Sequence, residues 1–277
     1  MMNDNWGKML LLNRMNELEH IDPFYSFALD ELLCHNAGKG GPPICHIWRH
    51  PQAFILGHRD SRLPEAKKAQ HWLESQGWAT IVRNSGGAAV PLDTGVVNIS
   101  LIFPKDNVLD HHFHDDFEHM YELISEALRS TKRIIEKGEI AGAYCPGDFD
   151  LSIDGYKFCG IAQRRKTHAS IIQAFVVAEG SGSNRADFVS SFYDIAASGH
   201  NDLGHPIVVG NSTASLEELA GLGPQAANQF ADAIQAVIRS RQSEEGVNAS
   251  SMNLRLPEPS EIDEMIAVLR ARYTIPE

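Results

Sequence analysis

The sequence predicts an α+β fold, in which a mixed or antiparallel sheet is flanked by helices. Two observations lead to this prediction. Short apolar segments bounded by glycine and proline alternate with longer segments in which apolar residues recur every three or four positions. The dipeptide Asp154-Gly155 separates two short segments and is the strongest local signal for an antiparallel hairpin. With 277 residues, the chain can form one catalytic domain and an appendage.

Composition and charge restrict the class of protein. The sequence has no apolar run of about 18 residues, and its N-terminal apolar patch is too short for a signal peptide. We therefore expect a soluble, cytoplasmic protein without a membrane partner. The net charge of −12 argues against nucleic-acid binding, but it allows either a neutral small substrate or a protein partner. Four cysteines without a C-x-x-C pair fit a reducing compartment and leave free thiols.

The first part of the chain alternates between helices and strands. A helix is expected over residues 23–36, where apolar side chains have helical spacing, and it ends at the loop GKGGPP. A second helix, LPEAKKAQHWLESQG, is ended by Gly77. The predicted strands in this part are ICHIWRH, AFILGH, WATIVR and VVNISLIFP.

The middle and end of the chain are richer in helices. Phe117, Tyr121, Ile124 and Leu128 share one helical face, so a long amphipathic helix is expected over residues 116–138. The last predicted strand is ASIIQAFVVA, bounded by GSGSN, which we interpret as a turn rather than a phosphate-binding loop. Two further helices are expected in PQAANQFADAIQAVIRSR and SEIDEMIAVLRARY, the second with Ser260 as N-cap, and a polar connection joins them.

These elements suggest three parts of the chain. They are an N-terminal segment (1–22), a catalytic domain (23–215) and a helical C-terminal extension (216–277). No internal repeat is visible.

The hairpin around Asp154-Gly155 determines which side chains share a face. A two-residue turn pairs Ser152 with Lys157, and it places Asp150, Ser152, Lys157 and Cys159 on one side. The other side, a predicted core face, carries Phe149, Leu151, Ile153, Tyr156 and Phe158. Lys157 therefore points away from that core, either into a site or simply into solvent.

A second group of residues is RNSGGAAV, between two predicted strands. Adjacent glycines let a backbone approach a ligand and present its N–H groups, although most Gly-Gly pairs are only turns. Arg83 at the start of this segment adds a positive charge.

Taken together, RNSGGAAV, NISLIFP and YCPGDFDLSIDGYKFCGIAQRR resemble the lipoate protein ligase and octanoyltransferase superfamily, which shares its fold with biotin protein ligases. The resemblance covers about residues 24–193. ATP-dependent ligases of this superfamily usually have Asn-Asp where this chain has Phe149-Asp150, and they lack a cysteine at position 145. Where many members have three glycines, this chain has Gly-Gly-Ala, ending at Ala88.

These differences favour acyl transfer without ATP. The implied reaction moves an octanoyl group from a lysine of the glycine cleavage system H protein to lysines of lipoyl domains of 2-oxoacid dehydrogenase complexes. It proceeds through a cysteine thioester and uses no cofactor. The alternatives are an octanoyltransferase that uses octanoyl acyl carrier protein, an ATP-dependent lipoate ligase, and a binding module without catalysis.

The resemblance implies that Cys145 is the nucleophile and that Lys157 is the second catalytic residue. Residue chemistry agrees in part, because Cys145 precedes Pro146-Gly147 in a loop, whereas Cys159 lies within a strand, where cysteines are usually packed. Cys159 remains a rival because it shares the predicted face of Lys157. An ammonium group near the thiol would favour the thiolate. The substrate-binding residues implied by the resemblance are Arg83, Ser85, Gly86, Gly87, Ala88 and Gly160.

Two other clusters carry weaker hypotheses. The run of His111, His112, His114, Asp115, Asp116 and His119 contains metal-ligand residue types, but we interpret it as a solvated helix start and predict no metal. Gln163, Arg164 and Arg165 either contact an acidic carrier domain or are ordinary surface residues.

Overall fold

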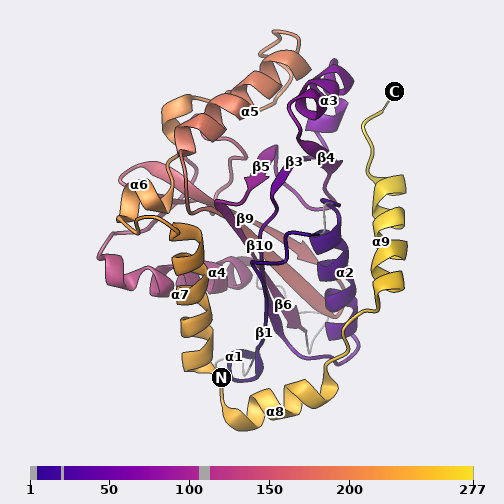
Figure 1. Ribbon diagram of the computed structural model, residues 1–277, viewed down its shortest axis with the longest axis vertical. Coiled ribbons are helices and arrows are strands. Elements are labelled where there is room, and N and C mark those ends of the chain that lie inside the picture. The colour runs from indigo at the N-terminus through magenta and orange to yellow at the C-terminus, as the bar shows by residue number, and fades with distance from the viewer. Residues whose placement is uncertain (1–4, 20–21, 106–112, 277) are drawn as a thin grey trace.

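The computed structural model describes residues 5–19, 22–105 and 113–276. Within these residues, the chain forms a seven-stranded mixed sheet and a three-stranded sheet, with helices on both faces of the large sheet (Figure 1). The predicted α+β fold is therefore confirmed, including the helical region at the C-terminal end.

The large sheet has the strand order β1-β2-β6-β10-β9-β8-β7. Only the β1–β2 pair is parallel among its described pairs. The strands of this sheet are β1 (Leu10–Arg14), β2 (Ile44–Trp48), β6 (Val96–Pro104), β7 (Glu136–Lys137), β8 (Leu151–Ile153), β9 (Tyr156–Arg165) and β10 (Ala169–Val177). The small sheet has the order β4-β3-β5 and consists of β3 (Gln52–Leu56), β4 (Ala79–Val82) and β5 (Val90–Asp93).

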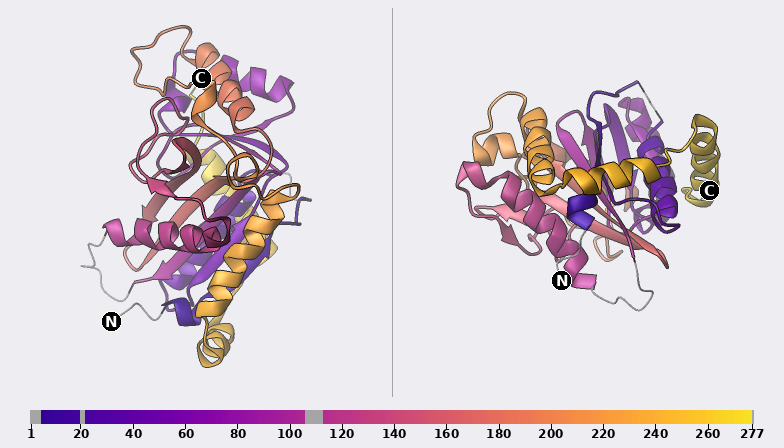
Figure 2. Two further views of the ribbon diagram at one scale, coloured as in Figure 1. Left: turned by 90° about the vertical axis from the view of Figure 1, so that its left-hand side faces the viewer. Right: turned by 90° about the horizontal axis from the view of Figure 1, so that it is seen from below.

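Two separate apolar cores lie on the two faces of the large sheet. One contains Phe230 and Ile234 of α7 with Leu123 of α4, and the other contains Leu33 of α2 and joins the sheet to the small sheet and α5. Figure 2 shows α7 running across the sheet beside α4. The α-helices are α1 (Asn5–Lys8), α2 (Tyr25–Ala37), α3 (Ala66–Ser75), α4 (Phe113–Ala127), α5 (Gly182–Ala196), α6 (Leu216–Ala220), α7 (Ala226–Arg241), α8 (Glu244–Asn253) and α9 (Pro259–Arg272).

The Asp154-Gly155 hairpin forms as predicted, but its register changes after two pairs. Both turn residues have positive φ, as a type I′ turn requires, and Ser152 pairs with Lys157. A β-bulge then leaves Phe158 without a partner on β8, so that Leu151 pairs with Cys159. The extra residue reverses the alternation of faces beyond this point.

Three residues in or next to the hairpin lie in environments other than those predicted. The prediction that Cys159 shares the face of Lys157 is wrong, because Cys159 packs with Phe158 in the core beneath α4 and α7. Tyr156 was expected in the core but is exposed, and Phe149 lines a pocket instead of joining the core face.

Three other local predictions need correction. The helix expected over residues 116–138 ends at Ala127, because Lys132 adopts a left-handed conformation and Glu136–Lys137 pair with β8. The expected polar connection contains α8. The N-cap of α9 is Glu258 rather than Ser260, since Glu258 and Glu261 form a reciprocal capping box around Pro259.

The GSGSN segment starts a helix instead of forming only a turn. Ser181 is the N-cap of α5 and accepts a hydrogen bond from Asn184 N.

Among the described residues, no helix is long and apolar enough to cross a bilayer.

We predict that α7 is integral to the stability of the fold. Phe230→Ala should lower the free energy of unfolding by about 3–5 kcal/mol, because it leaves a cavity in the core beneath the sheet. Urea denaturation measures this loss, and Val268→Ala on the exposed face of α9 is the control. An unchanged unfolding midpoint for Phe230→Ala would show that α7 contributes little to the core.

Candidate active site

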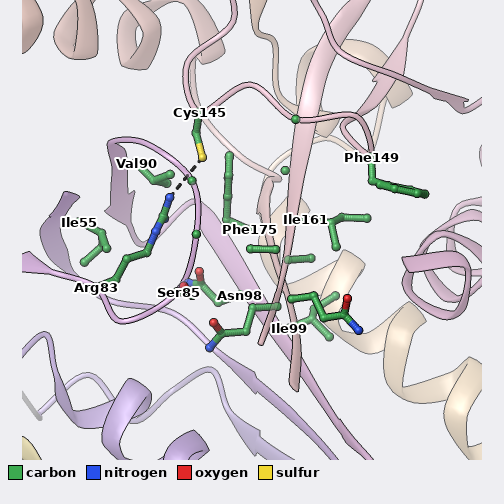
Figure 3. A pocket seen from close by; sticks show the side chains of 18 of the residues that line it. Ile55, Arg83, Ser85, Val90, Asn98, Ile99, Cys145, Phe149, Ile161 and Phe175 are labelled. Atoms are coloured by element: carbon green, nitrogen blue, oxygen red, sulfur yellow. Dashed lines mark hydrogen bonds between the residues drawn. The ribbon is translucent and has the colours of Figure 1, made fainter. Parts of the chain in front are cut away.

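A pocket of about 300 Å³ opens between the large sheet, the small sheet and the loop that carries Cys145. Figure 3 shows Cys145 at one end and Arg83 pointing toward it from the small sheet. Most of the lining is apolar and includes aromatic rings from several elements. These apolar residues are Phe27, Trp48, Ile55, Val90, Leu92, Ile99, Phe117, Phe149, Ile161, Ala174 and Phe175. Such a lining suits an alkyl chain.

The Cys145 side chain is directed at a charged and polar wall of this pocket. Its sulfur is 3.3 Å from Arg83 Nη2 and 3.3 Å from the backbone nitrogen of Ala88. The residue has φ 48°, a left-handed conformation that is uncommon outside glycine, and its side chain is only 9% exposed. Both neighbours can donate hydrogen bonds to the sulfur, so a guanidinium N–H and a backbone N–H lie beside the candidate nucleophile.

The Gly-Gly segment closes around the guanidinium of Arg83. Arg83 Nη2 also donates to the carbonyl of Ala88 at 2.6 Å, so a hydrogen bond joins the start and the end of the segment. Gly87 has φ 99°, and a Cβ there would lie 2.3 Å from Arg83 Nη2 and 2.9 Å from the Cys145 sulfur. Glycine is therefore required at position 87 by both conformation and space.

Lys157 lies behind the Cys145 loop and binds its backbone. Its ammonium group donates to the carbonyls of Tyr144 at 2.8 Å and Cys145 at 2.6 Å, and it is 2.7 Å from Asp150 Oδ2. The side chain is 1% exposed. The cation in contact with the thiol sulfur is thus Arg83, whereas Lys157 holds the loop from the other side.

Asp150 joins the ends of the same loop. Its Oδ2 atom accepts from Gly147 N at 3.1 Å, as well as pairing with Lys157. Burial raises the pKa of Asp150 to about 6, against the opposing effect of the Lys157 ammonium and the hydrogen bonds. The pKa of this carboxyl group therefore lies between the pKa of an aspartate in an unfolded chain and neutrality.

The other three cysteines are packed in the cores and, like Cys145, are unpaired. Burial raises the pKa of the Cys34 thiol to about 12 and raises those of Cys45 and Cys159 well above the ordinary value. Their thiolates are consequently rare near neutral pH, and Cys159 does not share the environment of Cys145.

Most of the predicted site residues meet in the pocket. Cys145, Arg83, Ser85, Gly86, Gly87 and Gly160 line it. Ala88 stands behind the lining with its N–H toward the sulfur, and Lys157 supports the loop from below. A Cβ at Gly160 would lie 2.4 Å from the Phe175 ring, so only glycine leaves this wall undisturbed.

Sequence reasoning missed two supporting residues. Tyr193 contacts the glycine loop (residues 83–89) from behind, and Asp60 binds the Tyr193 hydroxyl; both come from segments that carry no recognisable motif. The sequence predicts that Asp150 and Lys157 share one face of the hairpin. This shared face was the signal from which their ion pair could have been predicted.

Of the two remaining clusters, the one at residues 163–165 contributes Gln163 to the lining of this pocket. His111 and His112, and the side chains of His114 and Asp115, lie outside the described residues. Among the groups the structure does describe, no set of three metal-ligating residues converges. Arg164 pairs with Glu31, and both Gln163 and Arg165 bond to Asp116, so internal partners neutralise part of this charge.

The comparisons with known proteins fit this geometry. The family model described as the lipoyl protein ligase A/B catalytic domain matches residues 22–239. This chain belongs to that family. Within the lipoyl protein ligase A/B family, it is 44% identical over 200 residues to an octanoyl-[GcvH]:protein N-octanoyltransferase of Macrococcus caseolyticus, a match that covers 72% of each chain. A relative of the same name from Bacillus velezensis is 43% identical over 204 residues, covering 72% of this chain and 71% of the relative.

Solved structures of the family share the fold at low sequence identity. Lipoate-protein ligase A bound with ATP aligns with 96% of this chain and 94% of its own, with a TM-score of 0.62 and 18% identity. Protein Ta0514 from T. acidophilum, with bound lipoic acid, gives a TM-score of 0.62 at 17% identity, over 96% of this chain and 95% of that one. At this level the likeness supports the fold alone.

We predict that Arg83 controls the reactivity of the Cys145 thiol. Replacing Arg83 with methionine removes the guanidinium 3.3 Å from the sulfur and should raise the pH midpoint of iodoacetamide alkylation, because the cation beside a developing thiolate is lost. The rate is followed by mass spectrometry of the Cys145 peptide across a range of pH.

Arg49→Met is the matched control, because Arg49 bonds to the carbonyls of Met15 and Thr94 instead of the pocket. An unaltered midpoint in Arg83→Met would contradict the role of the guanidinium. The Lys157→Met variant tests the other cation and should act mainly through the shape of the loop.

We predict that Asp150 makes folding stability depend on pH in mildly acidic solution. Because the pKa of Asp150 is about 6 in the folded protein and near 3.8 in the unfolded chain, the folded state binds the proton more tightly. Its contribution to the free energy of unfolding is greatest below about pH 4. It declines by on the order of 3 kcal/mol as pH rises through about 6, at about 1.4 kcal/mol per pKa unit.

Urea denaturation of wild type and Asp150→Asn between about pH 4 and about pH 6 isolates the contribution of Asp150 to the free energy of unfolding. Other carboxyl groups contribute equally in both proteins. The exposed neighbour supplies the control variant, Asp148→Asn, which should follow the wild type. Parallel pH profiles for wild type and Asp150→Asn would contradict the prediction.

Proposed function

We propose that this protein is a protein N-octanoyltransferase that moves an octanoyl group between carrier lysines through a thioester on Cys145. The donor is the octanoyl-lysine of GcvH, the glycine cleavage system H protein, and the acceptor is a lysine of a lipoyl domain of a 2-oxoacid dehydrogenase complex. The observation that carries this proposal is the Cys145 sulfur at the end of an apolar pocket, with Arg83 and the Ala88 N–H both 3.3 Å away.

The first half-reaction forms the thioester. The Cys145 thiolate attacks the carbonyl carbon of the octanoyl amide, and the carbonyl oxygen of the tetrahedral intermediate becomes negatively charged. Collapse breaks the C–N bond, and the leaving lysine nitrogen takes up a proton from solvent and departs as the neutral amine. Arg83 and the Ala88 N–H face the sulfur before attack, and the backbone N–H groups of Gly86 and Gly87, two residues that line the pocket, are the candidates to bind the developing oxyanion.

The second half-reaction reverses this chemistry. An uncharged lysine amine of the acceptor attacks the thioester carbonyl, its nitrogen releases a proton to solvent, and the C–S bond breaks so that the Cys145 thiolate leaves. One amide is consumed and one amide is formed, so the exchange requires neither ATP nor a metal ion. Lys157 contributes by holding the carbonyls of Tyr144 and Cys145, which keeps the sulfur at the pocket.

The names of the relatives support the choice of donor. The Macrococcus caseolyticus and Bacillus velezensis proteins are named for octanoyl-GcvH, and they cover about seven tenths of this chain. A cytoplasmic location is part of the proposal, because both carriers and an unpaired, reactive thiol belong in a reducing compartment.

The decisive experiment combines the donor and the labelled residue. Purified enzyme is incubated with octanoylated GcvH in EDTA and apyrase, and intact mass followed by peptide mapping locates the octanoyl group. We expect an octanoyl adduct on Cys145 and subsequent transfer to an apo lipoyl domain. Cys145→Ser should lose the adduct and the transfer while remaining folded.

Cys159→Ser is the matched control, because it changes a buried thiol in the core and should retain the adduct. An adduct that persists in Cys145→Ser and disappears in Cys159→Ser would overturn the assignment. Activity only with ATP and magnesium would identify a ligase, and activity only from octanoyl acyl carrier protein would identify the other transferase. Function that survives Cys145→Ser would indicate a binding module.

A further inference from the structure

Tyr193 places a hydroxyl group directly behind the glycine loop. Tyr193 lies on α5 and is 3% exposed. Its hydroxyl donates to Asp60 Oδ1 at 3.0 Å and accepts from the backbone nitrogen of Ala89 at 3.2 Å. The buried Tyr193 hydroxyl therefore connects the Asp60 carboxylate to the Ala88–Ala89 peptide group.

Asp60 fixes this arrangement to the end of the neighbouring strand. The residue is 2% exposed, and its Oδ2 atom accepts from Gly57 N at 2.8 Å. Gly57 approaches the loop so closely that a Cβ there would lie 2.1 Å from the carbonyl oxygen of Gly87. Because β3 and β4 are parallel and end together, Gly57 and the glycine loop leave the small sheet side by side.

Successive peptide groups of this loop bind different partners. The Ala89 N–H is bound to Tyr193, whereas the Ala88 N–H points to the Cys145 sulfur and the Ala88 carbonyl accepts from Arg83. The Ala88 carbonyl and the Ala89 N–H belong to the same peptide group, so a rotation of this group would break the hydrogen bonds to Arg83 and Tyr193 together. The orientation of the groups around the sulfur thus depends on a hydrogen bond on the far side of the loop.

If Tyr193 and Asp60 served only the stability of the fold, part of this geometry would be left unexplained. A buried tyrosine needs only one neutral partner, yet this one binds a carboxylate, whose burial is costly. Burial raises the pKa of Asp60, while Gly57, Tyr193, Arg83 and His205 oppose that effect. The His205 ring also stacks on Tyr193, at 5.2 Å between centroids. These groups converge on the loop that faces the thiol.

We propose that Tyr193 and Asp60 are positioning residues that hold the 83–89 loop in the orientation in which Arg83 and the Ala88 N–H activate Cys145. This inference rests on the proposed role of Cys145. Neither residue touches the sulfur in the contacts described above, so both act through the loop.

The test compares thiol reactivity with turnover in Tyr193→Phe, which removes one oxygen atom and keeps the ring. Alkylation of Cys145 by iodoacetamide at pH 7 should be about tenfold slower, as expected for the loss of one supporting hydrogen bond, and its pH midpoint should rise. In octanoyl transfer, kcat should fall about tenfold while the KM for octanoylated GcvH stays unchanged, because the pocket and docking surface are intact.

Tyr25→Phe is the matched control. The Tyr25 hydroxyl accepts from Arg14 Nη1 at 3.0 Å and is remote from the loop, so its removal should change neither the alkylation profile nor kcat. A normal alkylation profile in Tyr193→Phe, with wild-type transfer intact, would overturn the positioning role and leave the proposed function standing. Absence of a Cys145 adduct in the wild type would instead overturn the proposed function.

Gly57→Ala provides a second, independent variant. Its Cβ displaces the Gly87 carbonyl and should also slow alkylation, and the double variant should be no slower than the slower single one, since both act on one loop. Effects that multiply in the double variant would contradict the proposal. If Tyr193→Phe does not fold, normal thiol reactivity in Gly57→Ala overturns it.

Discussion

The buried ammonium of Lys157 determines the shape of the loop on which the site depends. It binds the successive carbonyls of Tyr144 and Cys145, and two neighbouring carbonyls can face one cation only if the chain turns sharply. Cys145 provides that turn with φ 48°, a conformation that costs about 1–3 kcal/mol for a residue other than glycine. The hydrogen bonds to Lys157 offset this cost, and the sulfur consequently faces Arg83.

Two cations therefore serve different purposes around one thiol. Lys157 has a carboxylate partner in Asp150 and satisfies backbone carbonyls, so its charge is largely neutralised where it lies. Arg83 contacts the sulfur and the Ala88 carbonyl, and its buried Nε atom has no hydrogen-bond partner within the described part of the chain. The formation of a thiolate gives the guanidinium a countercharge, which couples the state of the sulfur to the loop that carries Arg83.

The sequence was most informative where local chemistry alone decides the structure. The Asp154-Gly155 turn, α2 and the long apolar strands were predicted because positive φ and side-chain periodicity are local properties. Six of the residues that the resemblance implied line the pocket, whereas its aromatic wall was not predicted. By contrast, the extra residue at Phe158 could not be predicted, since a bulge depends on the packing of both faces of the sheet.

Long-range contacts explain the other failures. Contact between the Cys145 sulfur and Arg83 joins residues 62 positions apart, and the Tyr193–Asp60 bond spans 133 positions. No pattern within either segment reveals such a meeting. Similarly, α8 has a polar sequence and is held in place because Ser243 and Ser250 bond to Gly7 and Lys8 at the other end of the chain.

The different surroundings of the four cysteines have a practical consequence for chemical biology. Cys34, Cys45 and Cys159 are completely enclosed, whereas Cys145 borders a cavity that is shaped for an alkyl chain. An electrophile attached to a medium-length hydrocarbon would therefore encounter a single addressable sulfur in the folded molecule. The protein is thus suited to selective covalent labelling without prior removal of its other cysteines, and its own pocket would supply the selectivity of the reagent.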